Sequence, residues 1–169
     1  MKRNFAEKLM GMSESSWERH ANPLSVYSRI FSFPFFAFAF WSYHIWGLVP
    51  AIIFAFLVSF WIWMNPRVFG IPKTTNNWAS KVTFGERIWL RHDRNDLPKW
   101  HSRLFINTLL GVSGLGFFGM AYFTYIKDFG MFLFFSSLCF FGKTWYCDRM
   151  AWLYEDMKSR KGYSEWLRS

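Results

Sequence analysis

Cysteine and charge are the two features that this sequence has least of. Its 169 residues include two cysteines, Cys139 and Cys147, which excludes a scaffold held together by several disulfides. Charged residues make up 18% of the chain, against roughly 25% in an average soluble domain. Hydrophobic residues make up 52%, which excludes intrinsic disorder. The shortage of charge therefore argues against both an ordinary soluble domain and a disordered chain.

The shortage of charge is concentrated in three stretches. No Lys, Arg, Asp or Glu occurs in residues 30–66, 104–126 or 129–142. A helix needs about 20 apolar residues to cross the hydrocarbon core of a bilayer. The first stretch has 37 residues, enough for two such helices, and Gly47 and Pro50 supply a turn between them. Four membrane helices are predicted, at 23–46, 50–64, 104–126 and 129–154.

Positive charge is distributed asymmetrically about these four helices. Residues 1–29, 65–103 and 143–169 hold 19 of the 20 Lys and Arg residues, and Lys127 is the remaining one. Positive residues gather on the cytoplasmic side of membrane proteins. The predicted fold is therefore an all-α, multi-pass protein of the cell membrane, with four transmembrane helices in two hairpins and both termini cytoplasmic.

We expect residues 1–169 to form a single membrane domain with three extramembrane parts. We expect a cytoplasmic arm over 1–22, a cytoplasmic interfacial segment over 65–103 and a cytoplasmic tail over 155–169. Residues 1–29 contain no long apolar run, so we expect no cleavable signal peptide and insertion led by the first helix.

Aromatic residues are what the sequence has in excess. It contains 22 Phe, 11 Trp and 7 Tyr, which together are 24% of the chain. Trp and Tyr favour the interface between membrane and water. The formal net charge of +9 could suggest nucleic-acid binding, but the cations lie on one side of a membrane protein. We therefore expect anionic lipid headgroups as partners, with a second copy or a membrane subunit as further possibilities, and no nucleic acid.

Local motifs predict where helices begin and end. Asn22 precedes a proline and is typical of an N-cap. Asn65-Pro66-Arg67 predicts the end of the second membrane helix. Ser15-x-x-Glu18 and Thr83-x-x-Glu86 both match the capping box, and the second predicts a short interfacial helix from Thr83 to about His92.

Glycine is concentrated in the third predicted membrane helix. Small residues allow the backbones of membrane helices to approach closely. We therefore expect this helix to pack tightly against phenylalanine-rich neighbours. The glycines concerned are Gly111, Gly114, Gly116 and Gly119.

Several motifs resemble those of a known family. They are Trp17-x-x-His20-Ala21-Asn22-Pro23, Asn65-Pro66-Arg67-x-Phe69, Trp78-Ala79-Ser80 and Gly85-Glu86-Arg87-x-Trp89-Leu90. These residues are similar to those of small prokaryotic four-helix membrane proteins catalogued only as a domain of unknown function. The resemblance covers most of the chain and implies a shared fold and a shared site on the cytoplasmic face. It implies no activity and no catalytic residue.

Polar residues of the cytoplasmic segments are the candidate ligand-binding residues. Arginine and asparagine on an aromatic-rich interface could hold a phosphate-bearing headgroup or a small anion. They could equally cap helices and form structural ion pairs, and the sequence leaves both interpretations open. The candidates are Asn22, Arg29, Asn65, Arg67, Asn77, Lys81, Arg87 and Arg103.

A non-catalytic role, in binding an anionic lipid, a small anion or a partner subunit, is the favoured interpretation. The first alternative is a membrane-embedded enzyme that acts on a lipid, with a site formed by His20, Glu86, His92 and His101. The spacing of these residues matches no familiar metal centre, so no metal or other cofactor is expected. Haem would need two facing histidines, and only His44 lies within a predicted span.

A small oligomeric transporter or channel is the second alternative. Such proteins normally carry ionisable groups at mid-membrane. The absence of charge from the predicted spans disfavours this alternative.

Overall fold

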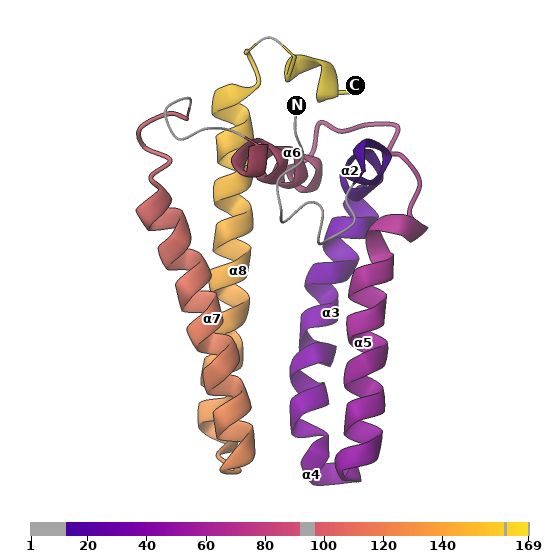
Figure 1. Cartoon of the computed structure of the whole chain (residues 1–169), viewed down its shortest axis with the longest axis vertical. Helices are drawn as coiled ribbons and strands as arrows, with labels where there is room; N and C mark the ends of the chain where they lie inside the picture. The colour runs from indigo at the N-terminus through magenta and orange to yellow at the C-terminus, as the bar shows by residue number, and fades with distance from the viewer. Residues whose placement is uncertain (1–12, 92–96, 161, 169) are drawn as a thin grey trace. The chain divides into compact units, whose positions relative to one another are not determined.

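The computed structural model describes residues 13–91, 97–160 and 162–168, and every regular element among them is a helix (Figure 1). The predicted all-α class is therefore confirmed. Three helices, α3, α5 and α7, are long and apolar enough to cross a membrane. The elements are α2 (Glu14–His20), α3 (Pro23–Trp41), α4 (Tyr43–Trp46), α5 (Leu48–Val68), α6 (Trp78–Arg91), α7 (Arg103–Tyr125), α8 (Phe129–Met157) and the short 3-10 helix η1 (Ser164–Trp166).

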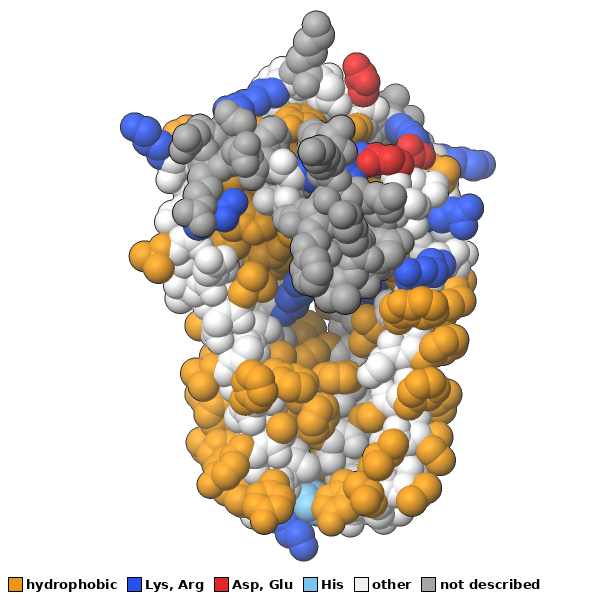
Figure 2. Space-filling model, in the orientation of Figure 1, with side chains coloured by type: hydrophobic (Ala, Val, Ile, Leu, Met, Phe, Trp, Pro, Cys, Tyr) orange, Lys and Arg blue, Asp and Glu red, His pale blue; other side chains and the backbone are white. Residues whose placement is uncertain are grey.

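The chain divides into two compact units. The polar unit comprises Met1–Tyr27, Asn65–Arg103 and Cys147–Ser169, and the apolar unit comprises Ser28–Met64 and Leu104–Tyr146. Only four charged residues of the sequence fall in the apolar unit. On the face shown in Figure 2, hydrophobic side chains cover the helices of the apolar unit. The division thus follows the charge pattern of the sequence.

The first hairpin of the apolar unit contains one interruption. We predict a single helix over 23–46, but the structure divides it into α3 and α4 at Ser42. The Ser42 hydroxyl donates to the Ala39 carbonyl at 2.7 Å, a local bond that competes with the regular helical pattern. Gly47 then ends the helix with a φ of 82°, a left-handed conformation that favours glycine. The predicted turn is therefore confirmed at Gly47, but α5 begins at Leu48, directly after this glycine, and not at the predicted residue 50.

The second helix of this hairpin, α5, continues past its predicted end at Asn65-Pro66-Arg67 and reaches Val68. Pro66 has no N–H and so removes one helical hydrogen bond. Asn65 is fully buried, and the Ser25 hydroxyl donates to its side-chain oxygen at 2.7 Å. The helix thus continues through the proline with Asn65 held against Ser25 of α3, a tertiary contact that the local motif does not show.

The second hairpin, formed by α7 and α8, packs closely at glycine. A Cβ atom on Gly116 would collide with the backbone of Cys139, and one on Gly119 would collide with a phenylalanine ring of α8. Nothing lies within 4 Å of such an atom on Gly111 or Gly114. The predicted close packing is therefore confirmed at two of the four glycines and is wrong at the other two.

The two hairpins of the apolar unit also contact each other. The Trp41 ring of α3 packs against Phe132 of α8, with ring centres 5.0 Å apart. His44 donates a hydrogen bond from Nε2 to the Thr124 carbonyl at 2.7 Å. Thr124 lies in the last turn of α7, where helical carbonyls lack partners within the helix. The imidazole is therefore a second donor to this carbonyl, which also accepts a hydrogen bond from the Lys127 N–H at 3.1 Å.

Gly116→Ala should destabilise the apolar unit, because the added methyl group forces α7 away from the backbone of Cys139. Overpacking of this kind costs about 1–3 kcal/mol. The measurement is thermal unfolding of the detergent-solubilised protein, with Gly114→Ala as the matched control, since that methyl group meets no atom within 4 Å. Equal melting temperatures for the two variants would contradict the close crossing.

Candidate functional site

Two of the candidate ligand-binding asparagines stabilise helix ends in the polar unit. The Asn22 side-chain oxygen accepts a hydrogen bond from the Leu24 N–H at 3.0 Å, so the predicted N-cap of α3 is confirmed. The Asn22 amide nitrogen also donates to the Gly70 carbonyl at 2.9 Å. Asn65 accepts from Ser25, as described above. These two side chains are therefore used to join α3 to the end of α5 and the loop that follows it.

A third asparagine caps α6. The Asn77 side-chain oxygen accepts from the Ser80 N–H at 2.9 Å, so α6 begins at Trp78 and the predicted start at Thr83 is wrong. Thr83 lies inside the helix, and its hydroxyl donates to the His20 carbonyl at 3.3 Å. The Ser80 hydroxyl donates to the Ala21 carbonyl at 2.7 Å. Side chains of α6 thus satisfy carbonyls at the end of α2.

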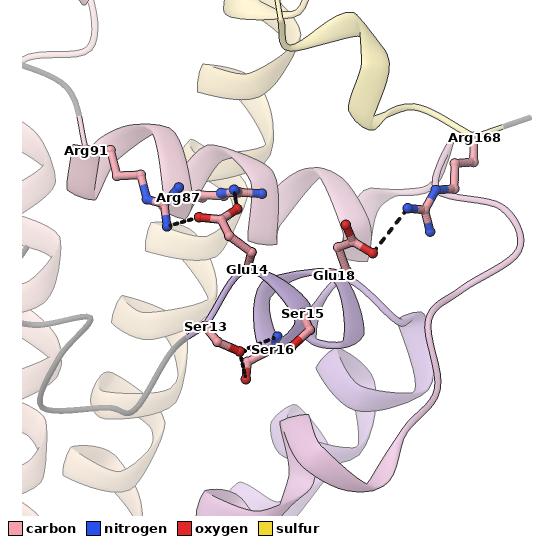
Figure 3. A network of polar contacts seen from close by, with 8 residues as sticks. All are labelled: Ser13, Glu14, Ser15, Ser16, Glu18, Arg87, Arg91 and Arg168. Atoms are coloured by element: carbon pink, nitrogen blue, oxygen red, sulfur yellow. Dashed lines mark hydrogen bonds and ion pairs between the residues drawn. The ribbon is translucent and has the colours of Figure 1, made fainter. Parts of the chain in front are cut away.

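The start of α2 also differs from the prediction. Ser13 is the N-cap, because its hydroxyl accepts from the Ser16 N–H at 3.1 Å. The predicted cap at Ser15 is therefore wrong. The cap at Ser13 makes Glu14 the first residue of α2, a position where a carboxylate interacts favourably with the helix dipole. Figure 3 shows this cap beside the ion pairs of Glu14.

Glu14 is the central acidic residue of the polar unit. Its carboxylate forms ion pairs with Arg87 and with Arg91 of α6, the second at 2.8 Å (Figure 3). The two arginine side chains are 10% and 5% exposed. Burying a cation is costly unless it is paired. The Arg87 guanidinium also lies over the Trp166 ring, 4.5 Å from its centre, in a cation–π contact.

The segment after α8 packs against the same part of the polar unit. The Thr75 hydroxyl accepts a hydrogen bond from the Arg168 backbone N–H at 2.6 Å. It also donates one to the Trp166 carbonyl at 2.9 Å. The Arg168 side chain pairs with Glu18 at 3.3 Å (Figure 3). The Tyr154 hydroxyl of α8 donates to a carbonyl of this segment at 3.1 Å, and burial raises the pKa of Tyr154 to about 12.

These contacts enclose a pocket of about 210 Å³ in the polar unit. It lies among α2, α6, the loop before α6 and the segment after α8. Its charged lining residues are Glu14, Glu18, Arg87, Glu165 and Arg168. Its other lining residues are Ala21, Thr75, Phe84 and Trp166. Of these nine residues, only Arg87 is among the candidates derived from the sequence.

A second cluster lies where α7 begins, and it contains the candidate catalytic residue His101. His101 is buried, and its Nε2 lies 2.8 Å from the Asp156 carboxylate of α8. The Trp100 indole donates to the same carboxylate at 2.7 Å. Burial alone would raise the pKa of Asp156, but the hydrogen bonds from Trp100 and His101 outweigh it and hold the pKa below its ordinary value.

Cations and exposed tryptophans surround this cluster. The Arg149 guanidinium lies over the Trp152 ring, 4.4 Å from its centre, and Trp152 in turn contacts the His101 ring edge-on. The Arg103 guanidinium lies over the Trp89 ring at 5.4 Å. Trp100 is 69% exposed and Trp152 is 47% exposed. We call this surface the tryptophan–arginine patch, and its members are Trp100, His101, Arg103, Arg149 and Trp152.

The remaining ligand-binding candidates occupy separate places. Lys81 of α6 pairs with Glu155 of α8 at 2.6 Å. The backbone carbonyl of Arg67 accepts a hydrogen bond from Arg19 at 3.5 Å. Arg29 belongs to the apolar unit. Within the polar unit, Lys81 and Arg87 thus form structural ion pairs, while Arg103 lies on an exposed surface.

The other candidate catalytic residues are placed as follows. His20 is buried, with its ring edge-on to Trp17 and a separation of 5.9 Å between ring centres. Glu86 is half-buried and makes no ion pair within the described ranges. His92 lies outside the described residues. Among the residues that the structure describes, no group of three or more His, Cys, Asp or Glu side chains could hold a metal ion.

Acid should destabilise the polar unit through two carboxylates of α8. Hydrogen bonds from Lys158 and Lys81 hold the pKa of Glu155 below its ordinary value of 4.5, and the pKa of Asp156 lies below 3.8. A lowered folded-state pKa gives stability that is present above the ordinary value and lost as the pH falls through the folded one. The melting temperature should therefore fall progressively below about pH 4.5.

The double variant Glu155→Gln, Asp156→Asn separates this effect from general acid denaturation. It should be less stable than the parent at pH 7, and its melting temperature should change less between pH 5 and 3. The same acid-dependent decrease in both proteins would show that other groups are responsible.

Comparison with known proteins gives one match. No curated protein and no solved structure matches the chain. A family model described as "Family of unknown function (DUF6653)" matches residues 2–169. The resemblance expected from the sequence motifs, to a family catalogued only as a domain of unknown function, is therefore confirmed. This chain belongs to DUF6653.

Proposed function

We propose that the chain is a four-span protein of the cell membrane whose cytoplasmic face binds anionic lipid headgroups through the tryptophan–arginine patch. The observation that carries this proposal is a pair of arginine–tryptophan contacts, Arg149 over Trp152 and Arg103 over Trp89, close to the exposed Trp100 and the first residue of α7. Arg103 is that first residue, and α7 is one of the helices apolar enough to span a membrane. A span that begins at Arg103 brings the patch to headgroup depth.

The chemistry of the patch suits that depth. Tryptophan favours the membrane interface, and arginine presents a planar fork that binds a phosphate with two hydrogen bonds. Each Lys or Arg near an anionic surface contributes about 1 kcal/mol to binding. Lys99 is exposed beside Trp100 and adds a third cation to Arg103 and Arg149. The proposal thus assigns headgroup binding to side chains near the surface rather than to the asparagines that cap helices.

The fourth span in this proposal is the first part of α8. This helix has 29 residues, and residues 129–142 at its start carry no charge. Lys143 follows, with its ammonium group 4.3 Å from the centre of the Tyr146 ring. A lysine near the end of a span can extend its charge to the interface, where tyrosine is also favoured. With this fourth span, all cations except Lys127 fall on the cytoplasmic side, with both termini.

Cysteine labelling tests this topology. In a background without Cys139 and Cys147, a cysteine at Gly47 or Asp128 should react with an impermeant reagent added outside intact cells. A cysteine at Asn76 or Ser164 should react only after the cells are permeabilised. Labelling at Asn76 from outside would contradict the four-span topology.

Lipid occupancy tests the patch. The variant Arg103→Gln, Arg149→Gln should retain anionic lipid about tenfold to 30-fold less well, because two cations contribute roughly 1 kcal/mol each. Native mass spectrometry of protein exchanged into phosphatidylglycerol-containing micelles measures this retention. Lys127→Gln is the matched control, since it removes a cation from the turn between α7 and α8.

The measured lipid retention distinguishes a lipid-binding site from a group of solvated cations that binds no lipid. Loss of phosphatidylglycerol from the double variant, with the control unchanged and both proteins folded, supports the proposal. Equal retention by the parent and both variants would show that the patch is not a lipid-binding site.

A further inference from the structure

The pocket of about 210 Å³ in the polar unit has no part in the proposed binding of anionic headgroups. Its volume is below the roughly 300–1,000 Å³ of sites for drug-sized ligands, so it suits a molecule with a few non-hydrogen atoms. Carboxylates approach it from two elements, Glu14 and Glu18 from α2 and Glu165 from η1. Phe84 and Trp166 supply an aromatic wall.

The two guanidinium groups that line the pocket differ in how firmly they are held. Arg87 is buried, paired with Glu14 and stacked on Trp166. Arg168 pairs with Glu18 at 3.3 Å, and both of those side chains are more than 40% exposed. Exposed ion pairs contribute little to stability, whereas taking Glu14, itself 65% exposed, would remove the carboxylate shared by the nearly buried Arg87 and Arg91. Glu18 is therefore the carboxylate that a ligand can take over at little cost.

The charge balance favours a cationic ligand over an anionic one. An anion would have to compete with a carboxylate at either guanidinium, with Glu14 at Arg87 or with Glu18 at Arg168. A cation needs only Glu165, which makes no ion pair among the described residues, and Glu18 after Arg168 has moved aside. The ion pair between Arg168 and Glu18 shows that this carboxylate can hold a cation.

The ligand chemistry can be narrowed further. Among the described residues no group of three or more acidic, histidine or cysteine side chains could hold a metal ion, whereas two carboxylates and an aromatic wall suit an organic cation. An organic cation carries carbon atoms that can pack against Phe84. The Trp166 ring, which already accepts Arg87 in a cation–π contact, offers a further surface for a cation.

We propose that this pocket binds a small primary ammonium compound. Its nitrogen is held by the carboxylates of Glu18 and Glu165, and its carbon atoms lie against Phe84 and Trp166. Thr75 fixes the backbone of the segment that carries Trp166 and Arg168, so the aromatic wall stays in place when the Arg168 side chain moves.

Isothermal titration calorimetry of the full-length protein in phosphatidylcholine nanodiscs tests this proposal, with n-propylammonium as the probe and propionate as its anionic counterpart. The parent should bind propylammonium saturably and propionate not at all. Glu165→Gln should weaken propylammonium binding about tenfold or more, because a charge-assisted hydrogen bond is lost. Arg168→Gln should tighten binding several-fold, because it frees Glu18 while leaving the backbone bonds to Thr75 unchanged.

Glu86→Gln is the matched control, because Glu86 is a half-buried carboxylate of the same unit that does not line the pocket. Its affinity for propylammonium should equal that of the parent. Saturable binding of propionate, an equal loss in the Glu86 and Glu165 variants, or no saturable heat from propylammonium in the parent and in Arg168→Gln would each overturn the proposal.

The ammonium group could belong to a free amine or to the headgroup of phosphatidylethanolamine. Titrations in nanodiscs that contain phosphatidylethanolamine distinguish the two sources. Unchanged propylammonium binding in these nanodiscs supports a free amine, and competition that Glu165→Gln abolishes supports the headgroup. This result is independent of phosphatidylglycerol retention by the tryptophan–arginine patch, so either proposal can fail alone.

Discussion

The ion pairs of Glu14 are the interaction on which the rest of the polar unit depends. Arg87 and Arg91 are nearly buried, and a buried guanidinium is tolerated only with a partner. Placing Glu14 beside them requires α2 to lie against α6. That placement brings the Ser80 and Thr83 hydroxyls to the last carbonyls of α2. Contacts between segments far apart in the sequence thus follow from one short acidic helix.

The sequence predicts those parts of the fold that local physics determines. Long uncharged runs become helices, because a chain segment without charge in an apolar environment must satisfy its backbone hydrogen bonds within itself. Asn22 caps α3 because capping involves only the next few residues. The end of α5 is misplaced because the local motif does not show the contact of Asn65 with Ser25, which lies 40 residues earlier. Thr83 is misread as a cap because its hydroxyl is used by another helix.

Fewer of the site residues can be predicted, because they are brought together by contacts between distant parts of the chain. Basic and aromatic composition predicts a surface where cations and aromatic rings meet, and Arg103 does lie over the Trp89 ring. Composition does not show which cations form ion pairs within the protein. Lys81 and Arg87 are therefore predicted as ligand-binding residues, although each pairs with a carboxylate. The pocket is formed from α2, α6 and a segment after α8. No spacing in the sequence connects Glu18 to Arg168, and only the fold brings them together.

The hydrogen bond between His44 and the Thr124 carbonyl restricts how this position can change during evolution. An imidazole at this place serves two purposes, since it joins the hairpins of the apolar unit and completes the end of α7. A replacement that keeps this bond must be a donor of similar reach, such as asparagine, glutamine, tyrosine or tryptophan among uncharged side chains. Substitution by leucine or phenylalanine would preserve hydrophobicity and leave the carbonyl with the Lys127 N–H alone, without the bond that joins the hairpins. We therefore expect family members to keep a hydrogen-bond donor at this position, whatever its hydropathy.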